Sequence, residues 1–378
     1  MTEAAKSDLE QIGPEHGQFN GEMLRLARGA HGMTQDELAK QLSRALTLST
    51  STLSNVSQNR VSRWEDGLSC PSKEEVPVIE DVLNFPASFF FQTESPCGFA
   101  TCCLYHRKRK TLPAATLHTI HDRINVLRIG VSRLLRNVAE LPCQFDRMDV
   151  DDFAGPEDVA RLVRAAWQLP LGPVRNLVAV VEAAGGIVIP CSFDTDKLDA
   201  VSQWPHRLPP LFFINRDAPV DRWRWNLAHE VGHIFMHRIP TPNAEEEADR
   251  FASEFLMPAR EITPELGEMT LEKAARLKPR WRVAMQAIIR KARDTGEITA
   301  RKYTSLYSYL SAKGYRKNEP VKIAPEEPTT LRRLVETHMS IMKYSVDDLA
   351  RLTFCRTHEQ FHARYSGENK RSQLRVVS

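Results

Sequence analysis

Apolar positions in the first quarter of the chain recur at helical spacing. Leucines and alanines fall three or four residues apart, with one break at the stretch GAHGMT. Thr34 suits the N-cap of the helix after this break, because its hydroxyl can accept from free amides and Glu37 occupies the capping-box position. A second helix, capped by Ser57, runs to about Glu65. The pattern predicts an all-α domain over residues 18–92.

The remainder of the chain mixes helical stretches with short apolar runs. Residues 93–170 carry a helical pattern and are predicted to form a helical linker region. Residues 171–322 contain two β-prone runs, GIVIPC and LFFIN, among amphipathic helices. Residues 323–378 are predicted to form a further helical segment, in which Ser345 caps a helix. We therefore predict an α+β protein: an all-α domain, then a mostly helical domain with a small β-sheet, then a helical C-terminal segment.

The composition is typical of a soluble globular protein. Of 378 residues, 42% are hydrophobic and 26% are charged, and the length favours two or three domains. The apolar runs are too short to cross a bilayer, and the polar N-terminus carries no signal segment. Seven cysteines, an odd number at irregular spacing, indicate reduced thiols. We expect a cytoplasmic protein with no membrane association.

The helix after Ser57 presents side chains that suit nucleic acid. Glutamine, asparagine and arginine make bidentate contacts to base edges, and hydroxyls suit phosphates. The stretches LRLARGAHGMTQDELA and VSQNRVSRWEDG resemble the helix-turn-helix of XRE/Cro/C1-type repressors, whose second helix enters the major groove. The candidate DNA-contacting residues are Gln35, Ser57, Gln58, Asn59, Arg60 and Arg63.

This resemblance implies an operator DNA as partner and, as the default for such repressors, a homodimer that reads paired half-sites. One departure is an insertion at residues 43–55, which is longer than the usual connection between two helices. The insertion either extends the first helix of the pair or displaces the second helix and weakens DNA reading. The alternative interpretation is a helical domain that serves only in interaction or dimerisation.

Two stretches match the pattern His-Glu-x-x-His, HEVGH at 229–233 and HEQFH at 358–362. In the first, His229 and His233 lie one helical turn apart, so their imidazoles can converge on one metal ion. Glu230 projects beside them, where it can take a proton from water activated by the metal. An acidic helix follows the first copy, whereas only 16 residues follow the second. We therefore predict that HEVGH is the metal site and that HEQFH is a charged helix with two exposed histidines.

The predicted helix over residues 243–258 can supply a third ligand. Glu245 and Asp249 stand one turn apart on one face of this helix. Glu245 can complete a set of two histidines and one carboxylate, while Asp249 can hydrogen-bond a ligand histidine. Glu246 and Glu247 remain alternative ligands in case the helix has a different phase.

A further histidine, His237, follows the first quintet. It lies two turns, about 12 Å, from His229 along the helix axis, so it cannot easily share the same ion. We expect it to support a ligand residue or to pack beside one. Two imidazoles and one carboxylate with an open position are typical of a catalytic Zn²⁺ site.

Six ordered segments resemble the ImmA/IrrE metallopeptidases: NLVAVVEAAGGIVI, LDAVSQW, LFFIN, WNLAHEVGHIFMH, EEEADRFASEFLMP and LKPRWRVAMQAIIRKARDTGEIT. The resemblance implies a zincin-like fold of gluzincin type that binds Zn²⁺ through His229, His233 and a downstream acid. It implies that Glu230 is the general base and that the substrate is a protein, such as a partner transcriptional repressor. Ala200 stands where the family commonly has glycine, which bears on substrate fit.

Three functions are compatible with these features. The first is a DNA-associated zinc endopeptidase that regulates transcription, in which an extended substrate adds to the edge of the LFFIN strand. The second is a transcriptional regulator whose zincin domain senses a ligand or partner and cleaves little. The third is an antitoxin-like interaction protein. Glu230 favours the first, because a purely structural zinc site needs no base.

Overall fold

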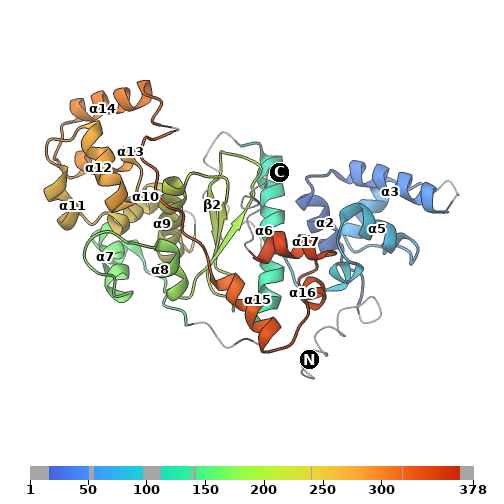
Figure 1. Ribbon diagram of the computed structural model, residues 1–378. Coiled ribbons are helices and arrows are strands. Elements are labelled where there is room, and N and C mark those ends of the chain that lie inside the picture. Colours follow the sequence, from blue (N-terminus) through green and yellow to red (C-terminus); the bar gives the residue numbers. More distant parts are fainter. Residues whose placement is uncertain are drawn as a thin grey trace, which may run out of the picture. The chain divides into compact units, whose positions relative to one another are not determined.

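The computed structural model describes residues 17–50, 55–96, 112–136, 138, 142–239, 241–316 and 318–366. The chain forms two compact units, and Figure 1 labels many of their elements. Unit 1 comprises residues 1–99, 109–140 and 330–378, and unit 2 comprises residues 100–108 and 141–329. Residues 93–170, predicted as one linker region, therefore contribute to both units.

The described part of unit 1 is helical. Its elements are α2 (Gly21–Ala30), α3 (Gln35–Thr50), α4 (Gln58–Glu65), α5 (Glu75–Leu83), η1 (Ala87–Phe91), α6 (Ala114–Leu135), α15 (Thr330–Ser340), α16 (Val346–Leu352), α17 (His358–Phe361) and η5 (His362–Ser366). The helical N-terminal part of the prediction is confirmed.

Polar caps start the helices of unit 1 where the sequence predicts them. The Glu37 amide donates to Thr34 Oγ1 at 3.2 Å, and the Thr34 amide donates to Glu37 Oε2 at 2.7 Å. These two bonds form a reciprocal capping box at the start of α3. Ser57 Oγ accepts from the Arg60 amide at 3.3 Å at the start of α4. Both predicted N-caps are confirmed.

The insertion at residues 43–55 extends the first helix of the predicted pair. α3 continues to Thr50, and the Ser43 hydroxyl then bridges to the chain beyond the insertion. It donates to the Val56 carbonyl at 3.2 Å and accepts from the Val56 amide at 2.9 Å. Val56 is buried and α4 packs against α3. Of the two alternatives, extension of the first helix is the one observed.

The C-terminal helices of unit 1 pack on its N-terminal half. α15 and α16 contact α6, which in turn contacts α2. The Phe354 ring meets the edge of Phe89 with centroids 5.4 Å apart, and Arg356 pairs with Asp81 at 2.8 Å. Ser345 caps α16, as predicted. The segment after residue 330 therefore shares a hydrophobic core with α2–α5.

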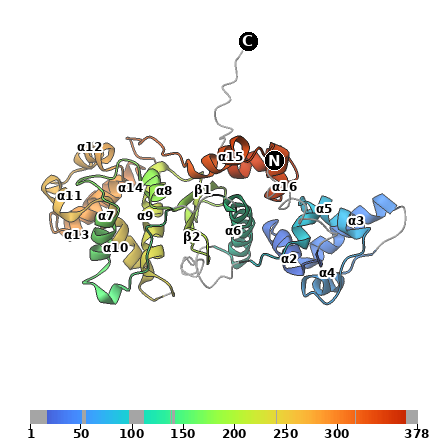
Figure 2. The same cartoon turned by 90° about the horizontal axis from the view of Figure 1, so that it is seen from below.

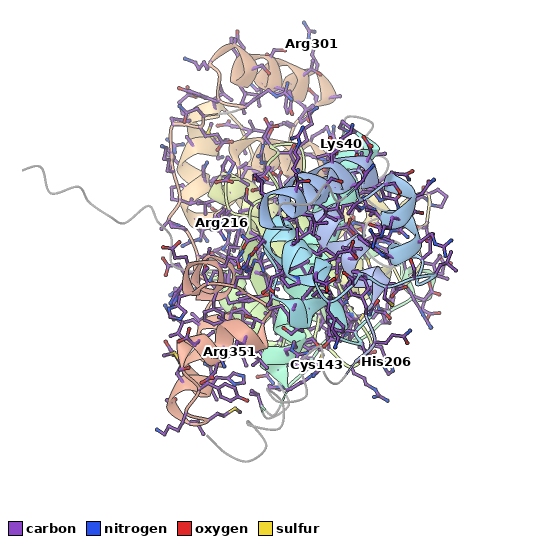
Figure 3. The ribbon with its side chains drawn as sticks, turned by 90° about the vertical axis from the view of Figure 1, so that its right-hand side faces the viewer. Lys40, Cys143, His206, Arg216, Arg301 and Arg351 are labelled. Atoms are coloured by element: carbon purple, nitrogen blue, oxygen red, sulfur yellow. The ribbon has the colours of Figure 1, made fainter. Side chains whose placement is uncertain are left out.

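Unit 2 contains a three-stranded mixed sheet, which confirms the α+β class. The strands are β1 (Ile187–Cys191), β2 (Ala200–Gln203) and β3 (Leu211–Asn215). β3 pairs in parallel with β1 and antiparallel with β2, so it is the central strand. Arg216, labelled in Figure 3, follows β3 and donates to the Pro190 carbonyl of β1 at 3.0 Å. The prediction that a substrate adds to the edge of LFFIN is wrong, because both edges of β3 are paired.

Helices pack around this sheet and around one another (Figure 2). They are η4 (Val150–Asp152), α7 (Pro156–Ala166), α8 (Leu177–Ala183), α9 (Val220–Met236), α10 (Ala244–Leu256), α11 (Ala259–Leu266), α12 (Leu271–Trp281), α13 (Met285–Asp294) and α14 (Ala300–Ala312). α9 contacts β2, β3, α7, α8 and α10, so it is the central helix of unit 2. No described helix of either unit is both long and apolar enough to cross a bilayer.

The close packing of α9 on α10 depends on Gly232. A Cβ atom at this position would lie 3.0 Å from Phe251 Cδ1, closer than packed side chains normally approach. Phe251 is fully buried, with ring centroids 6.4 Å from Phe235 and 5.6 Å from Phe255. Glycine therefore allows α10 to approach the helix that carries HEVGH.

Glu326 ties the segment after α14 to the start of α8. Its side chain is 2% exposed, forms an ion pair with Arg224, and lies 3.4 Å from Arg282. It also accepts from the amides of Leu177 and Val178 at 2.8 and 3.1 Å. These are amides that the first turn of a helix leaves without intrahelical partners. One buried carboxylate therefore accepts from a helix N-terminus and forms ion pairs with two arginines.

We expect Glu326→Ala to lower the free energy of unfolding of unit 2 by about 3–5 kcal/mol, because it leaves Arg224 as a poorly compensated buried charge. Urea unfolding followed by tryptophan fluorescence measures this effect, since five of the six tryptophans lie in unit 2. The control is Glu327→Ala, which removes an exposed neighbour and should cost less than about 0.5 kcal/mol. Equal effects of the two substitutions would contradict this role of Glu326.

Candidate metal centre

α9 brings His229 and His233 together on one face. Their Nε2 atoms lie 3.0 Å apart, and both side chains are buried. Their Nδ1 atoms face other partners: His229 Nδ1 is 3.0 Å from Asp249 Oδ1, and His233 Nδ1 is 2.9 Å from His237 Nδ1. Because residues four apart on a helix are stacked, the two imidazoles converge through Nε2, as the HEVGH spacing predicts.

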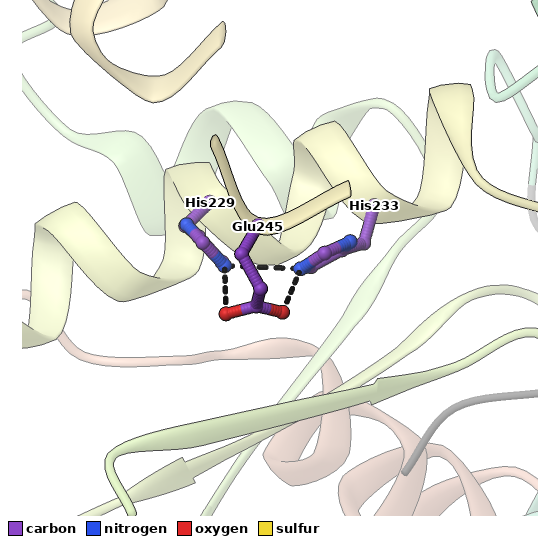
Figure 4. A group of neighbouring side chains, drawn as sticks. All are labelled: His229, His233 and Glu245. Carbon is purple, nitrogen blue, oxygen red and sulfur yellow. Dashed lines mark hydrogen bonds and ion pairs between the residues drawn. The ribbon is translucent and has the colours of Figure 1, made fainter. Parts of the chain in front are cut away.

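Glu245, in the first turn of α10, faces both imidazoles (Figure 4). Its Oε1 lies 3.4 Å from His233 Nε2, and its Oε2 lies 3.9 Å from His229 Nε2. Within the described ranges, these three residues are the one group of three or more His, Cys, Asp or Glu close enough to hold an ion, with ligand atoms within 4.8 Å. The geometry favours Glu245 over Glu246 and Glu247 as the third ligand.

The donor set fits a zinc ion. Zinc takes imidazole nitrogen and carboxylate oxygen at about 2.0–2.2 Å in a tetrahedron, which separates neighbouring ligand atoms by roughly 3.3–3.5 Å. The observed separations of 3.0, 3.4 and 3.9 Å bracket that range. Since a partner faces each Nδ1, each imidazole can carry its proton there and present the Nε2 lone pair to a metal. Three protein ligands with one open position are typical of catalytic zinc sites.

The two histidines differ in their affinity for protons. Burial lowers the pKa of His229, but the hydrogen bond to Asp249 and the nearby carboxylates outweigh it, so the pKa lies above its ordinary value. Burial lowers the pKa of His233 to about 4, so this imidazole is neutral at neutral pH. Only a neutral imidazole binds a metal. Protons therefore compete with a metal mainly at His229.

Glu230 projects from α9 beside the two histidines and is 2% exposed. The Ser202 hydroxyl, on β2, donates to Glu230 Oε2 at 2.6 Å. This bond holds the carboxylate between α9 and an edge strand of the sheet. The arrangement suits the general base that the sequence predicts, and Ser202 is a supporting residue that the sequence analysis missed.

Asp249 orients His229 from the second turn of α10. Burial raises the pKa of Asp249, but the hydrogen bond to His229 and the positive charges of His229 and Arg290 lower it below its ordinary value. Arg290 Nη1 lies 3.5 Å from Asp249 Oδ2. Asp249 is therefore ionised and can accept the Nδ1 proton of His229, the role predicted for it.

His237 lies just beyond the end of α9. Its backbone has left the helical conformation, with φ −118° and ψ 89°. Its Nδ1 faces His233, and its Nε2 lies 2.8 Å from Glu247 Oε2. His237 is not part of the three-residue ligand group, and it contacts that group through His233.

Arg147 closes the C-terminal end of α9. Its Nη1 donates to the carbonyls of Ile234 and His237 at 2.6 and 3.3 Å, and its guanidinium stacks on the Trp204 ring at 4.8 Å. Ile234 belongs to the last turn of α9 and His237 is its C-cap, and at this end of a helix intrahelical donors run out. Arg147 could not be predicted from the sequence, because no spacing rule connects it to a motif more than 80 residues later.

The second quintet, HEQFH, has one exposed histidine, His358, whereas His362 is half-buried, so the prediction of two exposed histidines is wrong for His362. The His358 side chain is 53% exposed and pairs with Asp347, whereas Phe361 is fully buried. α17 covers only four residues before the chain continues as a π-helical turn. HEQFH lies outside the one ligand group found in the described residues.

The predicted DNA-contacting residues gather at α3 and α4 of unit 1. Gln35, at the start of α3, accepts from Gln58 at 2.7 Å and donates to Glu65 at 2.8 Å. Arg60 pairs with Glu75 at 2.8 Å, which gives this arginine a structural partner. The exposed members of the predicted set are Ser57, Gln58, Asn59, Arg60 and Arg63.

A helix carrying two histidines and a glutamate, completed by a carboxylate from the next helix, is the arrangement of a metallopeptidase-type site. A family model described as Peptidase_M78, IrrE N-terminal-like domain, matches residues 181–293. Unit 2 thus contains an IrrE-like domain, and the matched range includes α9, α10 and β2. No curated protein matches the chain. The helices of unit 1 are compatible with an XRE helix-turn-helix.

We expect wild-type protein to contain about one zinc ion per chain by elemental analysis. His229→Ala should lose the metal, because it removes one of two converging imidazoles. His358→Ala is the matched control and should keep it, since this histidine belongs to the other quintet. Retention of zinc by His229→Ala together with loss in His358→Ala would reverse the assignment.

Proposed function

We propose that the protein is a zinc metalloendopeptidase that regulates transcription by cleaving a partner protein, such as a transcriptional repressor. The observation that carries this proposal is the convergence of His229, His233 and Glu245 beside a buried glutamate. The IrrE-like match supports a peptidase-type enzyme. A site that only stabilised the fold would have no use for the buried carboxylate of Glu230 beside the two imidazoles.

The residues divide the chemistry among them. His229, His233 and Glu245 would hold the zinc ion, which activates water and polarises a carbonyl when bound. Glu230 takes the proton from the attacking water and passes it to the leaving amine. Ser202 orients the Glu230 carboxylate through the 2.6 Å hydrogen bond.

The edge strand β2 is the element best placed to receive a substrate. It pairs on one side with β3, and its Ser202 contacts the proposed base directly. An extended peptide added to a sheet edge gains main-chain hydrogen bonds along its length. We therefore propose that a substrate lies along β2. The sequence predicted LFFIN (β3) for this role, but β3 is the central strand.

Glu230→Gln tests the peptidase function. This variant keeps the shape of the side chain but cannot act as a base, so cleavage should fall by about 10²–10⁴-fold while zinc content is unchanged. Zinc-loaded wild type and variant are each incubated with a lysate from cells that lack the protein, and new protein N-termini are identified by mass spectrometry. New termini produced equally by both proteins, or by neither, would favour the regulator that senses without cleaving.

We also propose that unit 1 binds operator DNA through α4. The supporting observation is the exposure of Gln58, Asn59 and Arg63 on a capped helix packed against α3. Glutamine, asparagine and arginine are side chains suited to base edges. Lys40 on α3, labelled in Figure 3, pairs with Asp36 at 2.6 Å. DNA binding would bring the peptidase to the promoters whose repressors it cleaves.

Arg63→Ala tests DNA binding. The probe is a labelled duplex selected from random sequences by the wild-type protein, with affinity measured by fluorescence anisotropy at fixed salt concentration. Loss of an arginine that contacts a base should weaken binding by about 10-fold or more. Arg25→Ala, which removes an exposed arginine from α2, is the control and should change affinity little. If no duplex is enriched, or if both variants bind as wild type does, unit 1 is an interaction domain.

A further inference from the structure

A chain of hydrogen bonds runs from His233 through His237 to Glu247. His233 Nδ1 and His237 Nδ1 are 2.9 Å apart, and His237 Nε2 is 2.8 Å from Glu247 Oε2. The two histidines are 2% and 3% exposed, and the glutamate side chain is 21% exposed. Most of this series of hydrogen bonds is therefore shielded from water. In a buried environment hydrogen bonds are stronger, and an unpaired polar atom costs more free energy.

A metal bound by His233 would fix the position of each proton in these hydrogen bonds. A ligand imidazole offers its lone pair at Nε2, so the proton of His233 lies on Nδ1. This N–H donates to Nδ1 of His237, which must then carry its own proton on Nε2. The second N–H donates to Glu247, since an ionised carboxylate only accepts. Glu247 therefore favours the tautomers that leave Nε2 of His233 available.

We infer that His237 and Glu247 are positioning residues that hold His233 in its metal-binding tautomer and raise the zinc affinity of the site; this inference rests on the proposed zinc site. His229 is oriented directly by Asp249, whereas His233 reaches a carboxylate through a second imidazole. Outer partners of metal ligands typically change metal affinity by about 10–100-fold.

The same geometry separates the roles of the three adjacent glutamates. Glu245 faces the two ligand nitrogens, Glu247 faces His237, and Glu246 is exposed. Residues two apart on a helix are rotated by about 200°, so 245 and 247 point in different directions from α10. α10 thus contributes the candidate ligand Glu245. On another side it contributes Glu247, the last acceptor in the hydrogen bonds that begin at His233.

The test measures Zn²⁺ affinity of the full-length protein by competition with a chromophoric chelator at neutral pH. Glu247→Ala should lower the affinity by about 10–100-fold. Glu247→Gln retains an acceptor oxygen and should recover part of that loss. Glu246→Ala is the matched control and should bind zinc as wild type does. Thermal unfolding of the metal-free variants shows whether each is folded. If Glu247→Ala is not folded, the zinc affinity of Glu247→Gln is compared with that of wild type instead.

A second readout distinguishes a tautomer effect from a loss of packing. Nitrogen NMR of ¹⁵N-histidine-labelled, zinc-loaded protein should show His233 protonated at Nδ1 and His237 protonated at Nε2. Glu247→Ala should shift the His237 signals toward mixed tautomers, a change that loosened packing alone would not produce. Equal zinc affinity in Glu247→Ala and Glu246→Ala overturns the inference. Absence of zinc from wild type, or unchanged affinity in His229→Ala, overturns the proposed zinc site instead.

Discussion

The contact between α9 and α10 is the constraint on which the candidate metal centre depends. Gly232 leaves the space that the Phe251 ring occupies, so the two helices lie closer than larger side chains would permit. The imidazoles come from α9, and the carboxylates of Glu245 and Asp249 come from the first two turns of α10. Hydrogen bonds and metal coordination act over about 2–3 Å, so a small separation of the helices would disconnect the site.

The part of this site that the sequence predicts follows from helical periodicity. His229 with His233, and Glu245 with Asp249, are each spaced by four residues, and one turn of helix is enough to place each pair on one face. The position of Glu245 opposite the imidazoles depends on packing between two helices. Helical periodicity alone left three adjacent glutamates, 245–247, as alternative third ligands. The contacts with His229 and His233 favour Glu245.

Residues that act across the fold leave no local pattern. Ser202 comes from a four-residue strand that the pattern analysis missed, because AVSQ lacks the apolar run of the other two strands. Arg147 reaches the end of α9 from an irregular segment. Helix boundaries in unit 1 were more predictable, since Thr34 and Ser57 act within three residues of their own position. Pairings of distant segments, such as Phe354 with Phe89, require the tertiary structure.

Charge balance explains why this arrangement favours a cation. Four carboxylates contact the histidines or project beside them: Glu230, Glu245, Glu247 and Asp249. Arg290 offsets one of them, and the remaining negative charge holds the pKa of His229 above its ordinary value. A divalent ion would neutralise more of this negative charge than a single proton does. HEQFH has no comparable set of acids in the described residues, since exposed His358 faces the single carboxylate of Asp347. The acidic surroundings, more than the quintet itself, therefore distinguish the two copies of the motif.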